Sequence, residues 1–228
     1  TAAAPDRVPR TAGLDLGLTD FAAITYSDGT REKVPAPRFD RKAQRKPARA
    51  QRELSRRVKG SKNRAKARAR VAKIHAKTRD LRQDFTRKIA VRLARENQAV
   101  AVETLNITGL ARTRLAKSIH DAGWGVFINE LTHAGLKYGC TVLRVSQWEP
   151  TSQVCSACGI RDGKKPLSVR VWACGGCGTV LDRDYNAAVN IMLAAGLAES
   201  LNDCGGDVRL RLAGAVPVEA VTTQLAAA

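Results

Sequence analysis

The amino-acid sequence predicts an α/β protein with a mixed sheet. Short apolar runs typical of strands come first, at 13–17 and 21–26, and two more follow at 98–105 and 140–146. Helical patterns lie between and after these runs. Strands and helices in this order are typical of a layered α/β core, and 228 residues suffice for one such core with a small appendage.

The first two strands are expected to form a hairpin, followed by a turn at 27–30 in which Gly29 can take positive φ. Asp15 stands inside the first strand, although Asp and Gly are both poor strand residues. A buried carboxylate is costly unless something pairs with it, and a metal ion is one such partner. The alternative is a turn aspartate at the end of an edge strand, and this stretch alone leaves both interpretations open.

The positive charge of the chain is concentrated in one segment. Its 39 Lys and Arg against 21 Asp and Glu give a formal net charge of +18 and a pI near 10.3. Between residues 38 and 95, 23 basic residues accompany only 4 acidic ones. Such an excess favours a polyanionic partner, most often nucleic acid.

Two basic helices are expected in 38–97, separated at 59–63 by Gly60 and Ser61. The second, from about Lys62 to Glu96, would be roughly 50 Å long at about 1.5 Å per residue. Its charged faces are either merely solvated or bind phosphates, and the near-absence of acidic partners favours phosphates. Its apolar stripe consists of Val71, Ile74, Leu81, Phe85, Ile89 and Leu93. The residues expected to bind nucleic acid are Arg56, Arg57, Lys59, Lys62, Arg64, Lys66, Arg68 and Lys77.

The second half of the chain is expected to surround a cysteine-rich insert with core elements. A helical segment is predicted around 118–139 and a final core helix at 182–197, and the Gly/Ala-rich end has no clear period. We therefore divide the chain into a core at 11–150 that contains the basic helical hairpin 38–97, a cysteine module at 151–180, a last core segment at 181–198 and a flexible tail at 199–228.

Four of the six cysteines have the spacing C-x₂-C-x₁₅-C-x₂-C. Two residues between ligands let a tight knuckle aim both thiolates at one ion, and four thiolates complete a tetrahedral structural zinc site. Redox dithiols and chance pairs are the alternatives, but a lone C-x₂-C suffices for redox work. The predicted zinc ligands are Cys155, Cys158, Cys174 and Cys177. Cys140 and Cys204 are interpreted as a core residue and a tail residue.

Three carboxylates lie in or beside segments predicted to be core: Asp15, Glu103 and Asp184. Cleavage of a phosphodiester by two metal ions needs such a set, because hard Mg²⁺ ions take oxygen ligands and carboxylates can hold two ions about 4 Å apart. From the residues alone, however, the favoured interpretation of the three is that they are ordinary turn and cap residues.

The chain resembles a known family through five motifs in order. These are "GLDLG", "VAVETLNITGL", "SIHDAGW", "PTSQVCSACG" and "VLDRDYNAAVNI". Together, over residues 11–195, they resemble the C-terminal portion of the TnpB/OrfB proteins of bacterial insertion sequences, which are related to type V CRISPR effector nucleases. The resemblance implies an RNase H-like (RuvC) mixed sheet with a long basic helical insertion and an inserted zinc ribbon.

The resemblance also assigns roles to residues. It implies that Asp15, Glu103 and Asp184 are the catalytic ligands of Mg²⁺ or Mn²⁺. Asp182 competes for the third place but is interpreted as a cap, and Asp121 is either a cap or functional. The implied partners are DNA and a guide RNA, with no membrane partner, in the bacterial cytoplasm at the nucleoid. Gly13 and Gly17 are expected to keep the backbone slim for a nearby nucleic-acid strand.

Three functions remain open from the sequence. The first is the nuclease module of an RNA-guided DNA endonuclease, and the second is a remnant that binds nucleic acid without cutting it. The third is a transposase that joins DNA ends. Family members carry an N-terminal region that binds RNA, whereas this sequence starts with Thr1, just before the first motif. A fragment of a longer protein and a truncated reading frame are both open. Guide binding by this chain alone is therefore in doubt.

Overall fold

A mixed sheet forms the centre of the molecule in the computed structural model, which describes residues 10–197 and 216–217. The strands are in the order β3-β2-β1-β4-β5-β8, with β1, β4 and β5 parallel and the others antiparallel to their neighbours. They are β1 (Thr11–Leu16), β2 (Asp20–Tyr26), β3 (Arg31–Pro35), β4 (Ala99–Glu103), β5 (Thr141–Val145) and β8 (Val216–Pro217). The predicted α/β class with a mixed sheet is confirmed.

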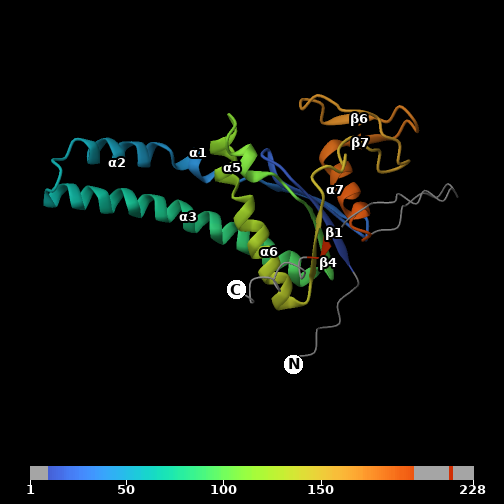
Figure 1. Ribbon diagram of the computed structural model, residues 1–228, viewed down its shortest axis with the longest axis horizontal. Helices are drawn as coiled ribbons and strands as arrows, with labels where there is room; N and C mark the ends of the chain where they lie inside the picture. Colours follow the sequence, from blue (N-terminus) through green and yellow to red (C-terminus); the bar gives the residue numbers. More distant parts are fainter. Residues whose placement is uncertain (1–9, 198–215, 218–228) are drawn as a thin grey trace, which may run out of the picture.

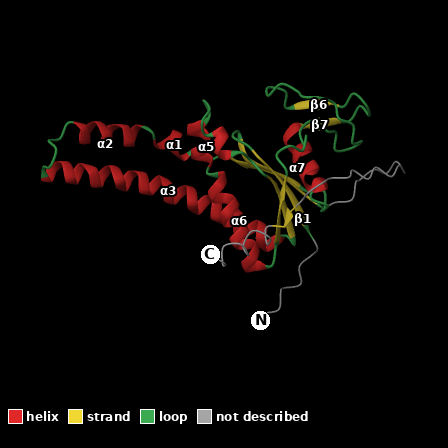
Figure 2. Cartoon of the chain, viewed as in Figure 1, coloured by secondary structure: helices red, strands yellow, loops and turns green. Residues whose placement is uncertain are grey.

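Helices cover both faces of the sheet (Figures 1 and 2). On one face, α3 (Lys62–Glu96) and α6 (Trp124–Tyr138) pack together and complete the main core. Phe21 of β2 is fully buried there, with its ring 5.1 Å from those of Phe85 and Phe127 in edge contacts. The opposite face carries α7 (Arg183–Ala194), which lies against β1, β2 and β4.

The edge strand β3 is absent from the sequence-based prediction. Pro35 and Pro37 indicate an exit from the sheet, but Pro35 ends a strand at the sheet edge, where proline is tolerated. On this strand Glu32 accepts a hydrogen bond from Tyr26 at 2.8 Å and pairs with Arg92 of α3. The preceding turn agrees with the prediction, since Gly29 has a φ of +82°.

The basic helices project from the core as a hairpin (Figure 1). After α1 (Phe39–Ala43), α2 (Arg45–Ser55) runs outward to the tip of the hairpin and α3 returns beside it to the core (Figure 1). Ser61 caps α3 by accepting a hydrogen bond from the Arg64 N–H. The predicted bounds of α3 are confirmed. Its apolar stripe is buried only near the sheet, so that Leu93 is fully buried while Leu81 remains 45% exposed.

The helical segment predicted around 118–139 consists of two helices. α5 (Ala116–Ala122) ends at Gly123, whose φ of +69° separates it from α6, and the short α4 (Ile107–Leu110) precedes it. Cys140 is buried as predicted. Most of the tail, and Cys204 with it, lies outside the described residues, although 216–217 pair with β5 as β8. Within the described residues, no helix is both long and apolar enough to cross a membrane.

Candidate active site and zinc site

Asp15 and Glu103 lie on the face of the sheet that α7 covers. β1 and β4 pair in parallel, with Leu14 opposite Val102, so the following residues reach the same carboxyl edge. Both Leu14 and Val102 belong to the core on the α3 side. Because successive side chains along a strand point to opposite faces, Asp15 and Glu103 both point to the α7 side.

The third carboxylate, Asp184, comes from the first turn of α7. Asp182 caps this helix, since its Oδ1 accepts hydrogen bonds from the N–H groups of Asp184 and Tyr185, each at 3.0 Å. The interpretation of Asp182 as a cap is therefore confirmed. Asp121 likewise serves a helix end, because its Oδ1 accepts the Asp40 N–H of α1 at 2.9 Å.

Gly13 allows α7 to lie directly on β1. A Cβ at this position would be 2.1 Å from the Ala188 carbonyl oxygen. A Cβ on Gly17 would be 2.8 Å from the Asp20 carbonyl oxygen. The expectation that these glycines make room for nucleic acid is therefore wrong, because the protein's own backbone fills the space beside each of them.

The electrostatics of the three carboxylates favour a bound cation. Burial raises the pKa of Asp15 to about 8, and the carboxylates of Glu103 and Asp184 add to this rise. Burial also raises the pKa of Glu103 to about 7. In such a site the loss of protons from the carboxyl groups is unfavourable, because the resulting charges are buried and repel one another. A divalent cation would stabilise the ionised carboxylates.

Two cations partly neutralise Asp184. The Lys33 Nζ lies 2.8 Å from Asp182 Oδ2 and 3.6 Å from Asp184 Oδ2. Arg170 approaches the other oxygen of Asp184, Oδ1, at 3.3 Å. No sequence pattern indicates either contact, because Lys33 lies on the unpredicted strand β3 and Arg170 lies in a loop without a local motif.

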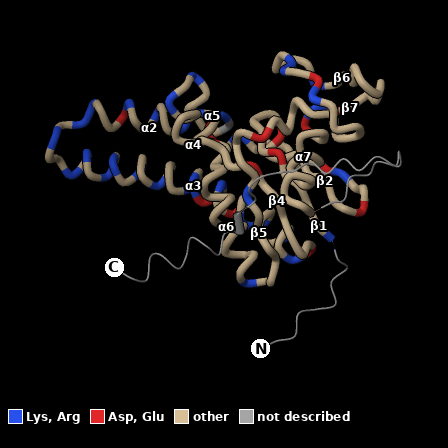
Figure 3. The backbone as a smooth tube through the Cα atoms, turned by 45° about the vertical axis from the view of Figure 1, so that its right-hand side comes forward, with Lys and Arg blue, Asp and Glu red and all other residues tan. Residues whose placement is uncertain are grey.

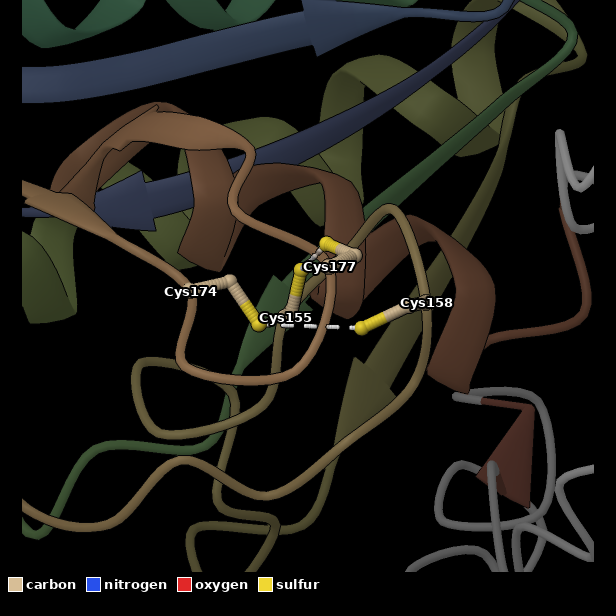
Figure 4. Close-up of side chains that lie close together, drawn as sticks. All are labelled: Cys155, Cys158, Cys174 and Cys177. Atoms are coloured by element: carbon tan, nitrogen blue, oxygen red, sulfur yellow. Dashed lines mark hydrogen bonds between the residues drawn. The ribbon is translucent and has the colours of Figure 1, made fainter.

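The four predicted cysteines converge on one point (Figure 4). Their sulfur atoms all lie within 4.8 Å of one another, with Cys155 and Cys177 3.8 Å apart and Cys158 and Cys174 3.7 Å apart. The two knuckles match: the N–H groups of Gly159 and Gly178 donate to the carbonyls of Cys155 and Cys174, each at 2.8 Å, and both glycines have positive φ. Four sulfurs so arranged fit a structural zinc ion. Among the described residues, these four cysteines form the one group of three or more His, Cys, Asp or Glu side chains whose ligand atoms lie this close together.

The cysteine module is attached to α7. It contains the small hairpin of β6 (Val171–Ala173) and β7 (Val180–Asp182). Asn186 of α7 accepts the Ser156 N–H at 2.8 Å and donates to the Val154 carbonyl at 2.8 Å. Asn190 donates to the carbonyls of Val154 and Thr151, both at 2.7 Å. The helix that carries Asp184 is therefore also the helix that holds the first knuckle.

The basic residues of the hairpin are mostly exposed, and Figure 3 shows Lys and Arg along its whole length. Arg64 differs from the rest, because its Nη1 donates to the carbonyls of Leu54 at 3.2 Å and Arg57 at 2.9 Å. It thus closes the tip of the hairpin, a role that its place in a basic run does not indicate. The exposed members of the predicted set are Arg56, Arg57, Lys59, Lys62, Lys66, Arg68 and Lys77.

A basic cleft of about 490 Å³ lies between α1 and α5. It begins beside Leu18, three residues after Asp15, and so opens near the same edge of the sheet. Arg38 on its wall has a φ of +52°, which is rare for a residue with a side chain. No local pattern in the sequence indicates this cleft. The cations that line it are Arg38, Arg41, Arg114 and Lys117.

The fold is that of an RNase H-like protein: a mixed sheet with the antiparallel β1–β2–β3 meander beside parallel β4 and β5, into which a four-cysteine ribbon is inserted. Residues 3–114 match the family model OrfB_IS605, described as "Probable transposase". Residues 124–191 match the model described as "Cas12f1-like, TNB domain". The chain belongs to the TnpB/OrfB family, as its motifs indicate.

Individual relatives agree with this family. A Streptomyces pristinaespiralis protein named "Putative RNA-guided DNA endonuclease" is 43% identical over 198 residues, which are 86% of this chain and 47% of the relative. A Mycobacterium tuberculosis protein, "Putative RNA-guided DNA endonuclease Rv2885c", is 28% identical over 187 residues, 78% of this chain and 40% of the relative. The chain thus spans about half the length of these relatives or less.

A solved structure shares the fold. The protein in a cryo-EM structure of a CRISPR-Cas12f ternary complex superposes with a TM-score of 0.61 at 20% sequence identity, over 84% of this chain and 40% of that one. The RNase H-like class with an inserted ribbon, predicted from the motifs, is therefore confirmed for the fold.

Proposed function

We propose that this chain is the RuvC-type nuclease portion of a transposon-associated, RNA-guided DNA endonuclease. The observation that supports the proposal is the placement of Asp15 and Glu103 on the paired strands β1 and β4, with Asp184 in the first turn of α7, which lies against both strands. Glu103 and Asp184 both raise the pKa of Asp15. The names of the relatives support DNA as substrate and RNA as guide. The reaction is hydrolysis of a DNA phosphodiester.

The three carboxylates would hold Mg²⁺ or Mn²⁺, and Cys155, Cys158, Cys174 and Cys177 one zinc ion. Divalent ions at the acidic site supply stabilisation of the attacking and leaving oxygens of an in-line displacement. The chain contributes rigid placement of each ligand, since Asp15 and Glu103 are fixed on paired strands and Asp184 on a helix capped by Asp182. Zinc at four thiolates leaves no open position, so its role is structural.

The parts of the chain divide this work. Residues 11–150 and 181–198 form the nuclease core, and the hairpin within 38–97 binds the phosphates of the guide, the target or both. The ribbon at 151–180 stabilises α7. Such a protein would act in the bacterial cytoplasm, at the DNA. The N-terminal part of a full-length relative would supply what this chain does not span.

Metal-dependent cleavage of single-stranded DNA tests the proposal. The parent chain with Mg²⁺ or Mn²⁺ should cut a labelled oligonucleotide, alone or with a relative's N-terminal half added in trans. Asp15→Ala, Glu103→Ala and Asp184→Ala should each nearly abolish cutting, because each leaves the ion clamp incomplete. Asp80→Ala is the matched control, since Asp80 is an exposed acid on α3 that pairs with its neighbour Arg79. Equal cutting by the parent and Asp15→Ala would refute the assignment.

Nucleic-acid binding without cleavage is the second candidate. It is favoured by the charge of the hairpin, which does not depend on the three acids. If the parent and the Asp15→Ala protein both bind DNA and neither cuts it under any of these conditions, this function replaces the first.

A further inference from the structure

The chain has three tryptophans, and one of them is exposed. Trp124 and Trp172 are 4% and 6% exposed, whereas Trp148 is 83% exposed. Trp148 lies in the turn that follows β5. An exposed indole offers a large flat apolar face that a partner can cover.

The turn that carries Trp148 is held at both ends by the elements of the candidate active site. On one side, Val145 pairs with Glu103, and its carbonyl accepts the Thr104 N–H at 2.8 Å. On the other side, the Thr151 carbonyl accepts from Asn190 of α7 at 2.7 Å. The indole is therefore attached to the carboxyl edge of the sheet between the strand that carries Glu103 and the helix that carries Asp184.

Two hydrogen bonds within the turn involve Trp148 and its neighbour Glu149. The Trp148 N–H donates to the Ser146 hydroxyl at 3.3 Å, and the Glu149 N–H donates to the Ser146 carbonyl at 3.2 Å. Tryptophan has only two side-chain torsions, so holding its ring against a partner costs little conformational entropy.

The surroundings of Trp148 narrow the kind of partner. Residues 146–151 contain no Lys or Arg, so this turn offers no positive charge to a phosphate. Its immediate neighbours, Gln147 and Glu149, are polar, so Trp148 does not extend into an apolar patch along the chain. A single flat ring among polar groups suits another flat ring with polar edges, and a nucleobase has that shape.

We propose that Trp148 stacks on a base of single-stranded nucleic acid that passes the candidate active site. This inference takes its choice of partner from the proposed function. It adds a contact that holds a base, in contrast to the phosphate contacts proposed for the hairpin. Stacking is tolerant of sequence because every base has a π face.

Intrinsic fluorescence tests the contact without any cleavage. The 228-residue chain carrying Asp15→Ala, without added divalent ion, is titrated with a dT oligonucleotide of about 20 nucleotides. Stacking should quench the emission of Trp148, while the two buried tryptophans should not respond. Trp148→Phe should bind nearly as well, by anisotropy of a labelled oligonucleotide, yet lose the quenching.

Affinity gives the second measurement. Trp148→Ala should weaken binding on the order of tenfold, within about 5- to 150-fold, by loss of one stacked base. The loss should be the same at 50 and 200 mM salt, because no phosphate contact is removed. Leu136→Ala is the matched control, since Leu136 is 68% exposed on α6 and should leave affinity unchanged.

Unchanged emission at saturation, parental affinity of Trp148→Ala, or no binding of the oligonucleotide would each overturn the inference. An apolar protein partner at Trp148 would give one of these results. Quenching in a chain that never cuts DNA would leave the stacking contact standing while the nuclease proposal fails.

Discussion

Replacing Gly13 by alanine tests how closely α7 must approach the sheet. The added Cβ would lie 2.1 Å from the Ala188 carbonyl oxygen and 2.8 Å from the Met192 Cβ. Neither atom can move away by a side-chain rotation, because one is helix backbone and the other is fixed to it. The clash is therefore relieved only if α7 withdraws from β1.

The size of the effect follows from these distances. Ordinary contacts of a Cβ begin near 3.4 Å, so α7 has to withdraw by about 1.3 Å at this point. Overpacking of this kind costs about 1–3 kcal/mol. In a chain of this size each 1 kcal/mol lowers the Tm by about 2–4 °C, so we expect a fall of about 5 °C. Cleavage should suffer more, because α7 carries Asp184 and a misplacement of about 1 Å can cost 10²-fold in rate.

Thermal unfolding followed by circular dichroism, together with the cleavage rate, measures both effects. Gly125→Ala is the matched control, since its Cβ would meet only Ile107 Cδ1 at 3.7 Å and its position in α6 favours alanine by about 1 kcal/mol. It should melt at the parental temperature or above. A Gly13→Ala protein that melts within about 1 °C of the parent, which is less than the roughly 2 °C expected for 1 kcal/mol, and cuts at the parental rate would show that the close approach of α7 is not required.

Three further outcomes are expected. Metal analysis should find about one zinc per chain. The Cys174→Ser protein should lose the zinc, while the Cys140→Ser protein should keep it. Zinc in both variants would contradict the site. If the hairpin contacts about six to ten phosphates, DNA affinity should fall roughly 10³- to 10⁵-fold between 50 and 200 mM salt. Lys62→Glu with Lys77→Glu should weaken binding and flatten that dependence, and salt-independent binding would show that the basic face is only solvated. Without added divalent ions, the pKa of Asp15 is about 8 in the folded chain and near 3.8 in the unfolded chain. Between these two pH values the folded chain holds a proton that the unfolded chain has released. The free energy of unfolding should therefore fall as the pH rises from about 4 to about 8. Asp15→Asn should remove this loss and raise the Tm at pH 8 more than at pH 5, and equal shifts at both pH values would refute the reasoning.

Those parts of the fold that are encoded locally can be predicted from the sequence. The apolar runs predict β1, β2, β4 and β5, and the clustering of the four cysteines follows from their spacing alone. Ser61 marks the start of α3, because its hydroxyl accepts a hydrogen bond from the N–H of Arg64, only three residues further along the chain. The bounds of the long basic helix are therefore predictable from short-range signals alone.

The remaining features depend on contacts between distant residues. Lys33 meets Asp182 across 149 positions, and no local pattern encodes that pair. β3 is an edge strand that ends in Pro35, so neither its pairing nor its burial leaves a clear alternation. The space beside Gly13 cannot be assigned to α7 from local sequence, because the helix that fills it follows about 170 residues later. Arg64 appears in the sequence as one cation among many, whereas in the fold it donates to the Leu54 carbonyl at the end of α2 and to the Arg57 carbonyl just beyond it.

The position of α7 near the end of the chain also determines the order in which the parts of the candidate active site are synthesised. Asp15 is translated long before Asp184, and the whole ribbon is made between them. At about 5–20 residues per second, the ribosome needs roughly 10–30 s to make the intervening segment. During that interval α7 does not cover β1 at Gly13, and the candidate acidic site lacks Asp184. A nascent chain released before α7 therefore carries the basic hairpin without an assembled acidic site.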